Sequence, residues 1–185
     1  MALWRGYREY AVTVAERVRT KLGLTAYDQL DIFKLAAYYG ITVVRFDEIN
    51  CGDEVIKHFT TKGWRQLSGY ILPVGDQLVM CLNPLHSEER IRSTMGHETS
   101  HVILNHEFDL LLTAEKACVS GSKDEEDEAD WLGAELLFPR AAARRAVLRS
   151  IPIEQVCQHY GVSFEIARWR TNICGAKKML KRSRQ

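Results

Sequence analysis

The sequence predicts an α+β protein in which a small antiparallel sheet packs on helices. Three observations support this prediction: apolar residues recur at helical spacing before residue 40, short β-branched runs occupy residues 41–83, and helical periodicity returns from Ser87. A length of 185 residues with 46% hydrophobic content is enough to bury a core, and it favours one domain over two large ones.

Two helices are predicted first. Apolar residues from Leu3 to Leu22 recur at helical spacing, and Gly23 follows as a stop signal. Residues 31–39 form a second amphipathic segment, with Gly40 placed just after its C-terminus. N-terminal helices are therefore expected to lead into the sheet.

Strands are predicted next. Residues 41–46, 69–73 and 77–83 are short, β-branched or apolar runs, and Val74-Gly75-Asp76 offers a turn between the last two. Residues 55–59 are a further candidate strand, and the polar residues 60–66 are expected to form a loop. These runs indicate a largely antiparallel sheet.

Helices are predicted again from Ser87, with acidic residues in the first turn, where the helix dipole favours them. A further helix begins at Ser122, whose spacing to Glu125 is that of a capping box, and ends at Phe138 before Pro139. Three more helical segments follow, at residues 141–149, 153–161 and 164–174.

Composition narrows the classes of function only slightly. A net charge of +1 indicates neither a basic coat for nucleic acid nor an acidic tail. The five cysteines contain no C-x-x-C pair, which favours reduced thiols over a disulfide framework or a thiolate zinc cluster. No apolar run approaches the ~18–20 residues of a membrane span, and the charged N-terminus does not resemble a signal peptide. We therefore expect a cytoplasmic protein.

The stretch Met95-Gly-His-Glu-Thr-Ser-His places two histidines four residues apart. On a helix such residues lie ~5–6 Å apart at Cβ, so His97 and His101 can direct imidazole nitrogens at one ion. A catalytic zinc needs a third protein ligand and an open position for water, and Glu98 is placed to take a proton from that water. Among six histidines this spacing also arises by chance, so a downstream carboxylate has to complete the site.

The acidic run at residues 124–128 supplies candidates, although such a run is by default the solvated first turn of a helix. Glu126 shares a helix face with Asp130 and Gly133, and glycine is costly inside a helix unless another element approaches closely. We expect this face to pack against the His97 helix. Glu126 would then reach the metal, and Asp130 would accept a hydrogen bond from the other nitrogen of a ligand histidine.

The paired motifs resemble the ImmA/IrrE family of minimal, thermolysin-like metallopeptidases: H-E-x-x-H is followed by E-x-x-A-D and then by A-E-L-L-F-P. The Arg90 and Arg92 pair and Gly161-Val-Ser163 are similar to family positions as well. The chain departs from the family at Thr99-Ser100 and Leu132-Gly133, where members often have Leu-Gly and Phe-Ala. These departures affect packing more than metal ligation.

The resemblance implies a gluzincin-type zinc peptidase. Zn²⁺ would be held by His97, His101 and Glu126, with Glu98 as the general base. It also implies a zincin-like metallopeptidase core at residues 1–140 and a helical segment at 141–176 packed on that core. From its composition and its terminal position, the basic segment 177–185 is expected to be a disordered tail. The strand at residues 77–82 would align a peptide through main-chain hydrogen bonds.

A peptidase of this kind needs a further group to share the charge of the oxyanion. Tyr70, His159 and Tyr160 are the candidates. His106 lies five residues beyond His101, which rotates it off the ligand face of the predicted helix. We expect His106 to be structural or to contact a ligand histidine.

The resemblance further implies an enzyme of bacterial or phage type that cuts a transcriptional repressor, or another regulatory protein, encoded nearby. Cleavage would release an operon or a stress regulon. The partner expected from the sequence is thus a protein substrate, not a membrane and not nucleic acid.

Two other functions stay open. Residues 153–172 resemble a helix-turn-helix, in which Arg168 and Arg170 are expected to be exposed, but the near-neutral charge gives DNA binding little electrostatic support. The second is a zinc-bearing partner of a toxin-antitoxin or repressor pair that performs no catalysis. Glu98 argues against it, because structural zinc is usually closed by four protein ligands.

Overall fold

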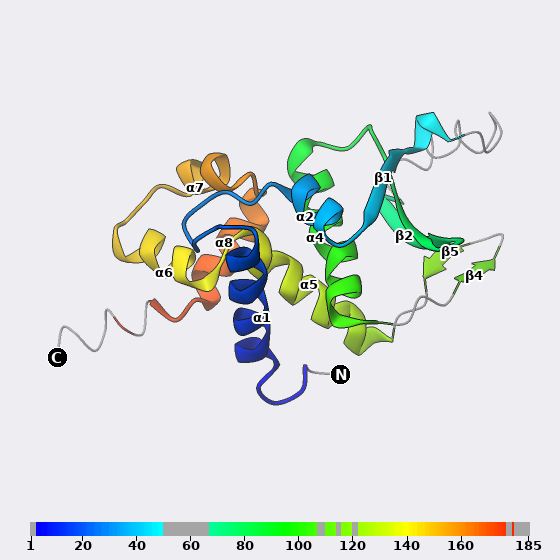
Figure 1. The fold of residues 1–185 in the computed structure, drawn as a ribbon. Helices are drawn as coiled ribbons and strands as arrows, with labels where there is room; N and C mark the ends of the chain where they lie inside the picture. Colours follow the sequence, from blue (N-terminus) through cyan, green and yellow to red (C-terminus); the bar gives the residue numbers. More distant parts are fainter. Residues whose placement is uncertain are drawn as a thin grey trace.

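The computed structural model describes residues 3–49, 67–106, 110–113, 116–119, 122–176 and 179. In chain order the elements are α1 (Tyr7–Lys21), α2 (Ile32–Tyr38), β1 (Ile41–Arg45), the 3-10 helix η1 (Phe46–Glu48), β2 (Gly69–Val74), β3 (Gln77–Leu82), α4 (Glu88–Leu104), β4 (Leu110–Thr113), β5 (Lys116–Val119), α5 (Lys123–Leu137), α6 (Arg140–Leu148), α7 (Ile153–Tyr160) and α8 (Phe164–Ile173). Figure 1 shows the sheet at one end of the molecule, α6 to α8 at the other, and α4 and α5 between them.

Helices packed on a small sheet confirm the α+β class, but the three-stranded sheet is mixed rather than antiparallel. In the order β1-β3-β2, strands β2 and β3 form the predicted hairpin, whereas β1 pairs with β3 in parallel. A two-residue turn forces antiparallel pairing, and the long connection between β1 and β2 imposes no such constraint. The candidate strand at 55–59, the loop at 60–66 and most of the basic tail lie outside the described residues.

A second, two-stranded sheet was not predicted. It consists of β4 and β5, which pair antiparallel with Leu110 opposite Val119 and Thr113 opposite Lys116. Each strand has only four residues. Apolar runs of this length do not distinguish a strand from other structures by periodicity.

The two central helices begin where the capping signals predict. Ser87 accepts a hydrogen bond from the Arg90 amide at the start of α4. Ser122 and Glu125 form the capping box of α5, each side chain accepting from the other's backbone N–H at 3.2 and 2.7 Å. Since these caps satisfy backbone donors locally, the sequence alone predicts both starts.

A close contact between two glycines brings α4 and α5 together. A Cβ atom on Gly133 would lie 3.0 Å from the Gly96 carbonyl carbon and 3.0 Å from the His97 nitrogen. A Cβ atom on Gly96 would meet the more flexible Leu137 side chain at 3.3 Å. The predicted role of Gly133 is therefore confirmed, and the contact lets short acidic side chains of α5 reach the histidines of α4.

We expect Gly133→Ala to lower the free energy of unfolding by about 1–3 kcal/mol, because the added methyl group meets the rigid backbone of α4. Urea denaturation of the metal-free protein measures this effect. Gly96→Ala is the matched control and should cost less, since a side chain can move away. Equal stability of Gly133→Ala and the wild type would contradict the close contact.

Helix α8 packs inward through a buried ion pair. Arg170 is 2% exposed, and its guanidinium contacts the equally buried carboxylate of Glu135 and donates to the Phe138 carbonyl oxygen at 3.1 Å. The predicted exposure of Arg170 is therefore wrong, because a counter-ion on α5 covers it; Arg168 is exposed as predicted. Arg92 of α4 also donates to the carbonyl oxygens of Tyr160 and Gly161, which ties the α7–α8 turn to the motif helix.

Removing Glu135 would leave Arg170 buried without a counter-charge. We expect Glu135→Ala to destabilise the protein by about 3–5 kcal/mol, whereas replacing both partners with Leu should restore much of the loss. Thermal or urea unfolding of the wild type and these two variants measures the difference. A Glu135→Ala variant as stable as the wild type would contradict the buried ion pair.

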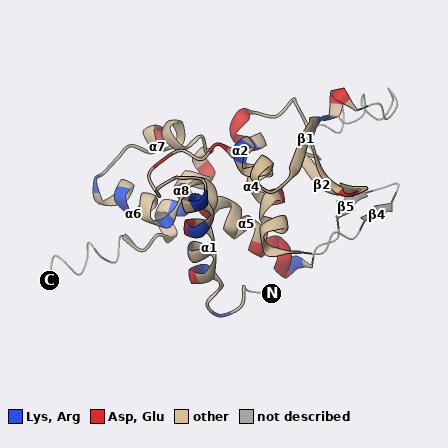
Figure 2. Cartoon of the chain, in the orientation of Figure 1, with Lys and Arg blue, Asp and Glu red and all other residues tan. Residues whose placement is uncertain are grey.

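Charge is distributed unevenly over this fold. Figure 2 shows Asp and Glu positions, in red, at the start of α5, and Lys and Arg positions, in blue, on α6 at the other end of the molecule. Cys81 and Cys174 are buried thiols, in line with the expectation from composition. In the described part of the chain, no helix is both long and apolar enough to cross a membrane.

Candidate metal centre

Helix α4 directs two imidazoles at one point. His97 and His101 lie one helical turn apart, and their Nε2 atoms are 3.1 Å from each other. His101 is buried at 6% exposure, while His97 is half-buried at the edge of a cleft. The i,i+4 spacing thus brings together two nitrogens that can share a ligand.

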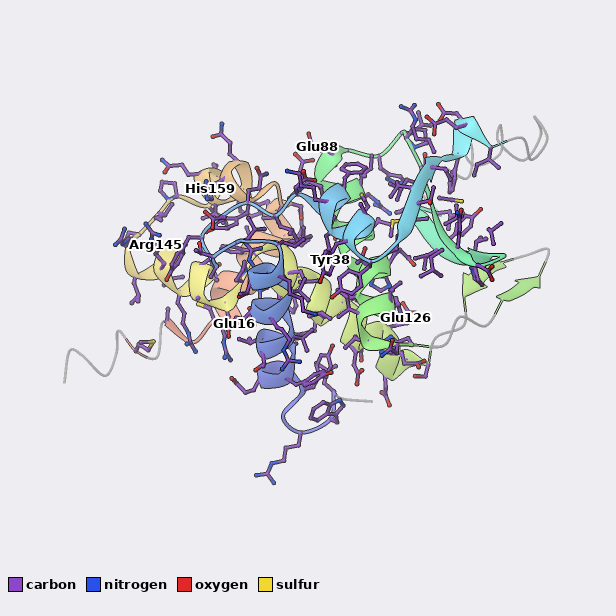
Figure 3. All side chains as sticks on the ribbon, in the orientation of Figure 1. Glu16, Tyr38, Glu88, Glu126, Arg145 and His159 are labelled. Atoms are coloured by element: carbon purple, nitrogen blue, oxygen red, sulfur yellow. The ribbon has the colours of Figure 1, made fainter. Side chains whose placement is uncertain are left out.

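Glu126 reaches these nitrogens from α5. Its carboxylate oxygens lie 3.2 Å from His97 Nε2 and 3.5 Å from His101 Nε2. One potential ligand atom from each of the three side chains lies within 4.8 Å of the others. Figure 3 shows Glu126 at the start of α5, next to the end of α4.

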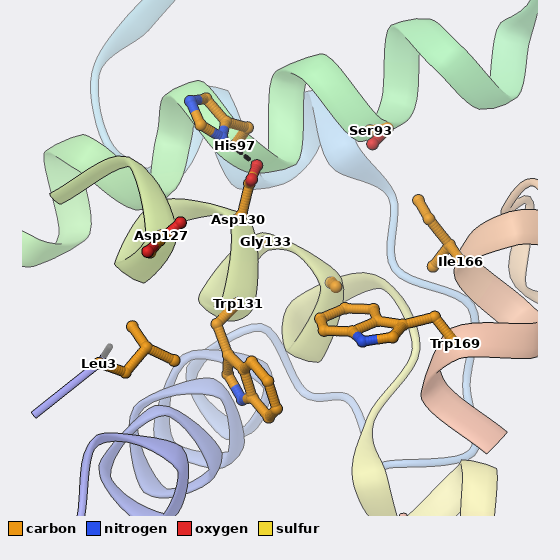
Figure 4. A pocket seen from close by; sticks show the side chains of 10 residues that line it. Leu3, Ser93, His97, Asp127, Asp130, Trp131, Gly133, Ile166 and Trp169 are labelled. Atoms are coloured by element: carbon orange, nitrogen blue, oxygen red, sulfur yellow. Dashed lines mark hydrogen bonds and ion pairs between the residues drawn. The ribbon is translucent and has the colours of Figure 1, made fainter. Parts of the chain in front are cut away.

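Asp130 lies behind His97. Its Oδ1 atom is 2.8 Å from His97 Nδ1, and Figure 4 shows this contact beside a pocket that also contains Trp131 and Trp169. When the Nδ1–H of His97 donates to this carboxylate, the Nε2 lone pair is left to face Glu126 and His101.

His101 has a partner of a different kind. Its Nδ1 atom lies 2.9 Å from Nδ1 of His106, whose Nε2 atom lies 3.4 Å from a carboxylate oxygen of Glu128. His106 is therefore not on the ligand face but contacts a ligand histidine from outside, one of the two roles expected for it.

The electrostatics favour a positive charge between the three side chains. Burial lowers the pKa of His97, but hydrogen bonds to Asp130 and Glu126 and the charge of Glu98 outweigh it and raise the pKa to about 10. Burial and the charge of His97 lower the pKa of His101 to about 4. The hydrogen bond with His97 lowers the pKa of Glu126. A metal ion would have to displace the proton of His97, since only a deprotonated nitrogen is a ligand.

Glu98 is half-buried beside this cluster, at the edge of the same cleft as His97. Burial raises its pKa to about 7, the charge of His97 opposes this rise, and the backbone amide of Ile71, which donates to the carboxylate, opposes it as well. A carboxylate held near neutrality can both accept and return a proton, which is the property of a general base that later acts as an acid.

Glu98 meets the open side of strand β2. The Asn83 amide donates to the Ser68 carbonyl oxygen at 2.9 Å and so extends the β2–β3 ladder. In an antiparallel ladder every second residue pair is hydrogen-bonded, and the pair of Ser68 and Asn83 is one of these. Gly69, Ile71 and Pro73 belong to the pairs in between, so their backbone N–H and C=O groups point away from β3. Pro73 suits such an edge position because it has no N–H to donate.

An open cleft of about 1060 Å³ extends from Gly69, at the start of β2, past the motif helix. Its lining includes His97 and Glu98 of α4 and, from the α7–α8 turn, Ser163 and Phe164. The cleft is large enough for an extended peptide segment, and it includes one of the three candidate ligands and the candidate base.

The strand predicted to align a peptide does not have a free edge. Strand β3, which spans the predicted residues 77–82, is the central strand and pairs with β1 on one side and β2 on the other. All of its backbone positions are therefore committed to the sheet. Among the described strands of this sheet, β2 is the edge strand that faces Glu98.

Tyr70, a candidate oxyanion stabiliser, lies on the wrong face of β2. Gly69 faces α4, since a Cβ atom there would lie 2.9 Å from the Thr94 methyl carbon, and Ile71 is fully buried. Side chains alternate along a strand, so Tyr70 points to the opposite face, where its ring centroid lies 5.8 Å from that of Phe46. This position does not support the oxyanion role.

His159 and Tyr160, the other two candidates, lie away from the cluster. Both direct their polar atoms at the carbonyl oxygen of Tyr27, at 2.9 Å for His159 Nε2 and 3.4 Å for the Tyr160 hydroxyl. Figure 3 shows His159 at the α7 end of the molecule, far from Glu126. The reason is that α7 turns this face toward the α1–α2 connection.

The donor set fits zinc. Two imidazole nitrogens and one carboxylate are the protein ligands of many catalytic zinc sites, in which a fourth position stays open. The donors also have the outer contacts that such ligands require, from Asp130 to His97 and from His106 to His101.

The cluster has the ligand types of a metallopeptidase site, two histidines and a carboxylate. The family model of the IrrE N-terminal-like domain, Peptidase_M78, matches residues 36–172. The chain therefore belongs to this peptidase family, as the resemblance to ImmA/IrrE proteins indicated. No curated protein matches the chain. The family match includes α7 and most of α8, so the segment that resembles a helix-turn-helix is part of the peptidase domain.

Three contributors to the site were missed. Glu128 belongs to the acidic run, but nothing in the sequence distinguishes it from its solvated neighbours. The backbone of Ile71 leaves no signal in a side-chain pattern. Gly96 could have been found, because it sits inside the predicted helix next to the motif, where glycine is as costly as at Gly133.

Proposed function

We propose that the chain is a zinc-dependent endopeptidase in which His97, His101 and Glu126 hold the metal and Glu98 is the general base. The observation that carries this proposal is that these ligand atoms lie within 4.8 Å of one another, next to Glu98, a half-buried carboxylate that lines the same cleft as His97. A structural zinc site would have no use for a carboxylate tuned toward neutrality at its open side.

Each protein group has a separate task in the reaction. Zinc, when bound, would supply Lewis acidity toward the scissile carbonyl group and the attacking water. Glu98 takes a proton from that water and later returns it to the amine of the leaving peptide, so that the carboxylate ends the cycle as it began. Asp130 keeps His97 in the tautomer whose Nε2 atom is free.

The open side of β2 is the proposed peptide-binding edge. A substrate added as a strand would bond to the outward backbone groups of Gly69 and to the carbonyl oxygen of Ile71, whose amide donates to Glu98. Main-chain recognition places the scissile bond next to Glu98 and tolerates many side chains. Selectivity for one target then comes from the rest of the cleft.

The substrate class proposed from the ImmA/IrrE resemblance is a transcriptional repressor or a related regulatory protein encoded near this chain, cut in the cytoplasm. A repressor is inactivated when its DNA-binding and oligomerisation parts are separated. One cut in an exposed, extended connection would suffice, and an open cleft along a strand edge suits such a segment.

The test is to incubate the zinc-loaded protein with the repressor encoded nearby and to identify products by intact mass. We expect one main cut, whose rate falls to background when a chelator removes the metal and recovers when zinc is returned. A repressor left intact by protein with one bound zinc would favour the non-catalytic, zinc-bearing partner. Cleavage that persists without metal would contradict the proposed mechanism.

A further inference from the structure

We infer that His106 and Glu128 form a positioning relay that holds His101 in its metal-binding tautomer and orientation. The relay consists of the two contacts His101 Nδ1 to His106 Nδ1 and His106 Nε2 to Glu128 Oε2. The inference rests on the proposed metal centre and adds two residues to it that touch neither metal nor substrate.

The end of α4 brings His106 back to His101. The helix stops at Leu104, and Asn105 adopts a left-handed conformation with φ 55° and ψ 39°. The His106 amide then donates to the His101 carbonyl oxygen at 3.0 Å. A continued helix would have turned His106 away, whereas this turn sets the two imidazoles edge to face with their centroids 4.9 Å apart.

The hydrogen bonds allow one consistent set of proton positions. His101 Nε2 faces His97 and Glu126, so it must carry the lone pair when it binds a cation. Its proton is then on Nδ1 and is donated to Nδ1 of His106. A neutral His106 that accepts at Nδ1 carries its own proton on Nε2, where Glu128 accepts it.

Burial makes this relay hard to replace by water. The side chains of His106 and Glu128 are 8% and 18% exposed, whereas Asp130, which performs the same task for His97, is 73% exposed. The backbone of Glu128 is also fixed by α1, since the Tyr7 hydroxyl donates a hydrogen bond to the Glu128 carbonyl oxygen at 2.7 Å. Loss of the His106 acceptor would therefore leave the Nδ1–H of His101 without a substitute partner.

The test compares zinc affinities of purified variants by competition with a chromophoric chelator. We expect His106→Leu to weaken zinc binding by roughly 10–100-fold, the usual effect of removing an outer contact of a ligand histidine. His106→Asn should recover most of the affinity, because its Oδ1 atom can accept the same proton. Glu128→Gln should stay near the wild type, since its amide oxygen still accepts, and Glu128→Leu should not.

Two further measurements separate positioning from a general effect on the fold. The visible spectrum of the cobalt-substituted protein should change in His106→Leu, since the orientation of a ligand imidazole changes. The metal-free variants should still unfold cooperatively and well above the assay temperature, so that a loss of zinc affinity does not reflect loss of the fold. His159→Leu is the matched control, a histidine bonded to a backbone oxygen at the other end of the molecule, and should retain zinc affinity.

The possible failures are distinguishable. Wild-type protein that binds no zinc contradicts the proposed function itself. Wild-type protein that binds zinc, together with a His106→Leu variant of equal affinity and unchanged cobalt spectrum, contradicts the relay alone. An affinity loss in His106→Leu that His106→Asn does not restore also contradicts it, because the hydrogen-bond acceptor would then not be the cause.

Discussion

Glu98→Gln is expected to abolish most peptide cleavage while leaving the zinc content unchanged. The substitution keeps the size of the side chain and removes the group that accepts the proton of the attacking water. General bases contribute roughly 10²–10⁴-fold to a rate, so kcat should fall by that factor. The ligand atoms of His97, His101 and Glu126 are untouched, and metal analysis should find one zinc per chain in both proteins.

The neighbouring Thr99 provides a control for Glu98→Gln. Its side chain is fully buried, so Thr99→Val tests whether a substitution within the motif disturbs the helix in general. We expect Thr99→Val to keep its cleavage activity and zinc. Cleavage by Glu98→Gln at the wild-type rate would show that another group activates the water.

Glu126→Ala is expected to lose stoichiometric zinc binding. Among the described residues, Glu126 is the carboxylate that contacts both imidazoles, and without it the two histidines of α4 are a bidentate site. The loss of affinity should exceed the ~10–100-fold that outer contacts provide. Zinc content after dialysis against a defined free zinc concentration measures it.

Asp127→Ala is the matched control for Glu126→Ala. It removes an adjacent carboxylate of the same acidic turn, which lies next to the small pocket of Figure 4 and outside the His97, His101 and Glu126 group. Asp127→Ala should retain zinc. If both variants lose zinc equally, the total charge of the turn, and not ligation by Glu126, explains binding.

Local chemistry explains why much of this protein could be predicted from its sequence. The helix starts at Ser87 and Ser122 depend on hydrogen bonds to groups three residues away, and the helical period alone brings His97 and His101 together. The approach of α5 to α4 could also be predicted, because glycine destabilises a helix interior and Gly133 is therefore expected only where another element comes close. These features depend on neighbours in the sequence.

Features that depend on distant residues could not be predicted. Strand β1 joins β3 in parallel although a long segment separates them. Arg170 looks like a surface residue until Glu135 is placed against it. Tyr70, His159 and Tyr160 are plausible by residue type, but strand alternation and the packing of α7 direct them elsewhere.

His106 combines both cases. If the helix continued by one more turn, as its sequence pattern predicts, its rotation would carry His106 away from His101. The left-handed conformation of Asn105 ends the helix instead, and asparagine is among the few residues other than glycine that adopt it readily. One backbone conformation therefore decides whether His106 faces solvent or a ligand histidine.

The most direct test of the metal centre is X-ray diffraction from crystals of the zinc-loaded protein, with data collected on both sides of the zinc absorption edge. We expect one anomalous peak within bonding distance of His97 Nε2, His101 Nε2 and a carboxylate oxygen of Glu126. A zinc peak bound elsewhere on the chain, with these three side chains hydrogen-bonded only to each other, would contradict the account.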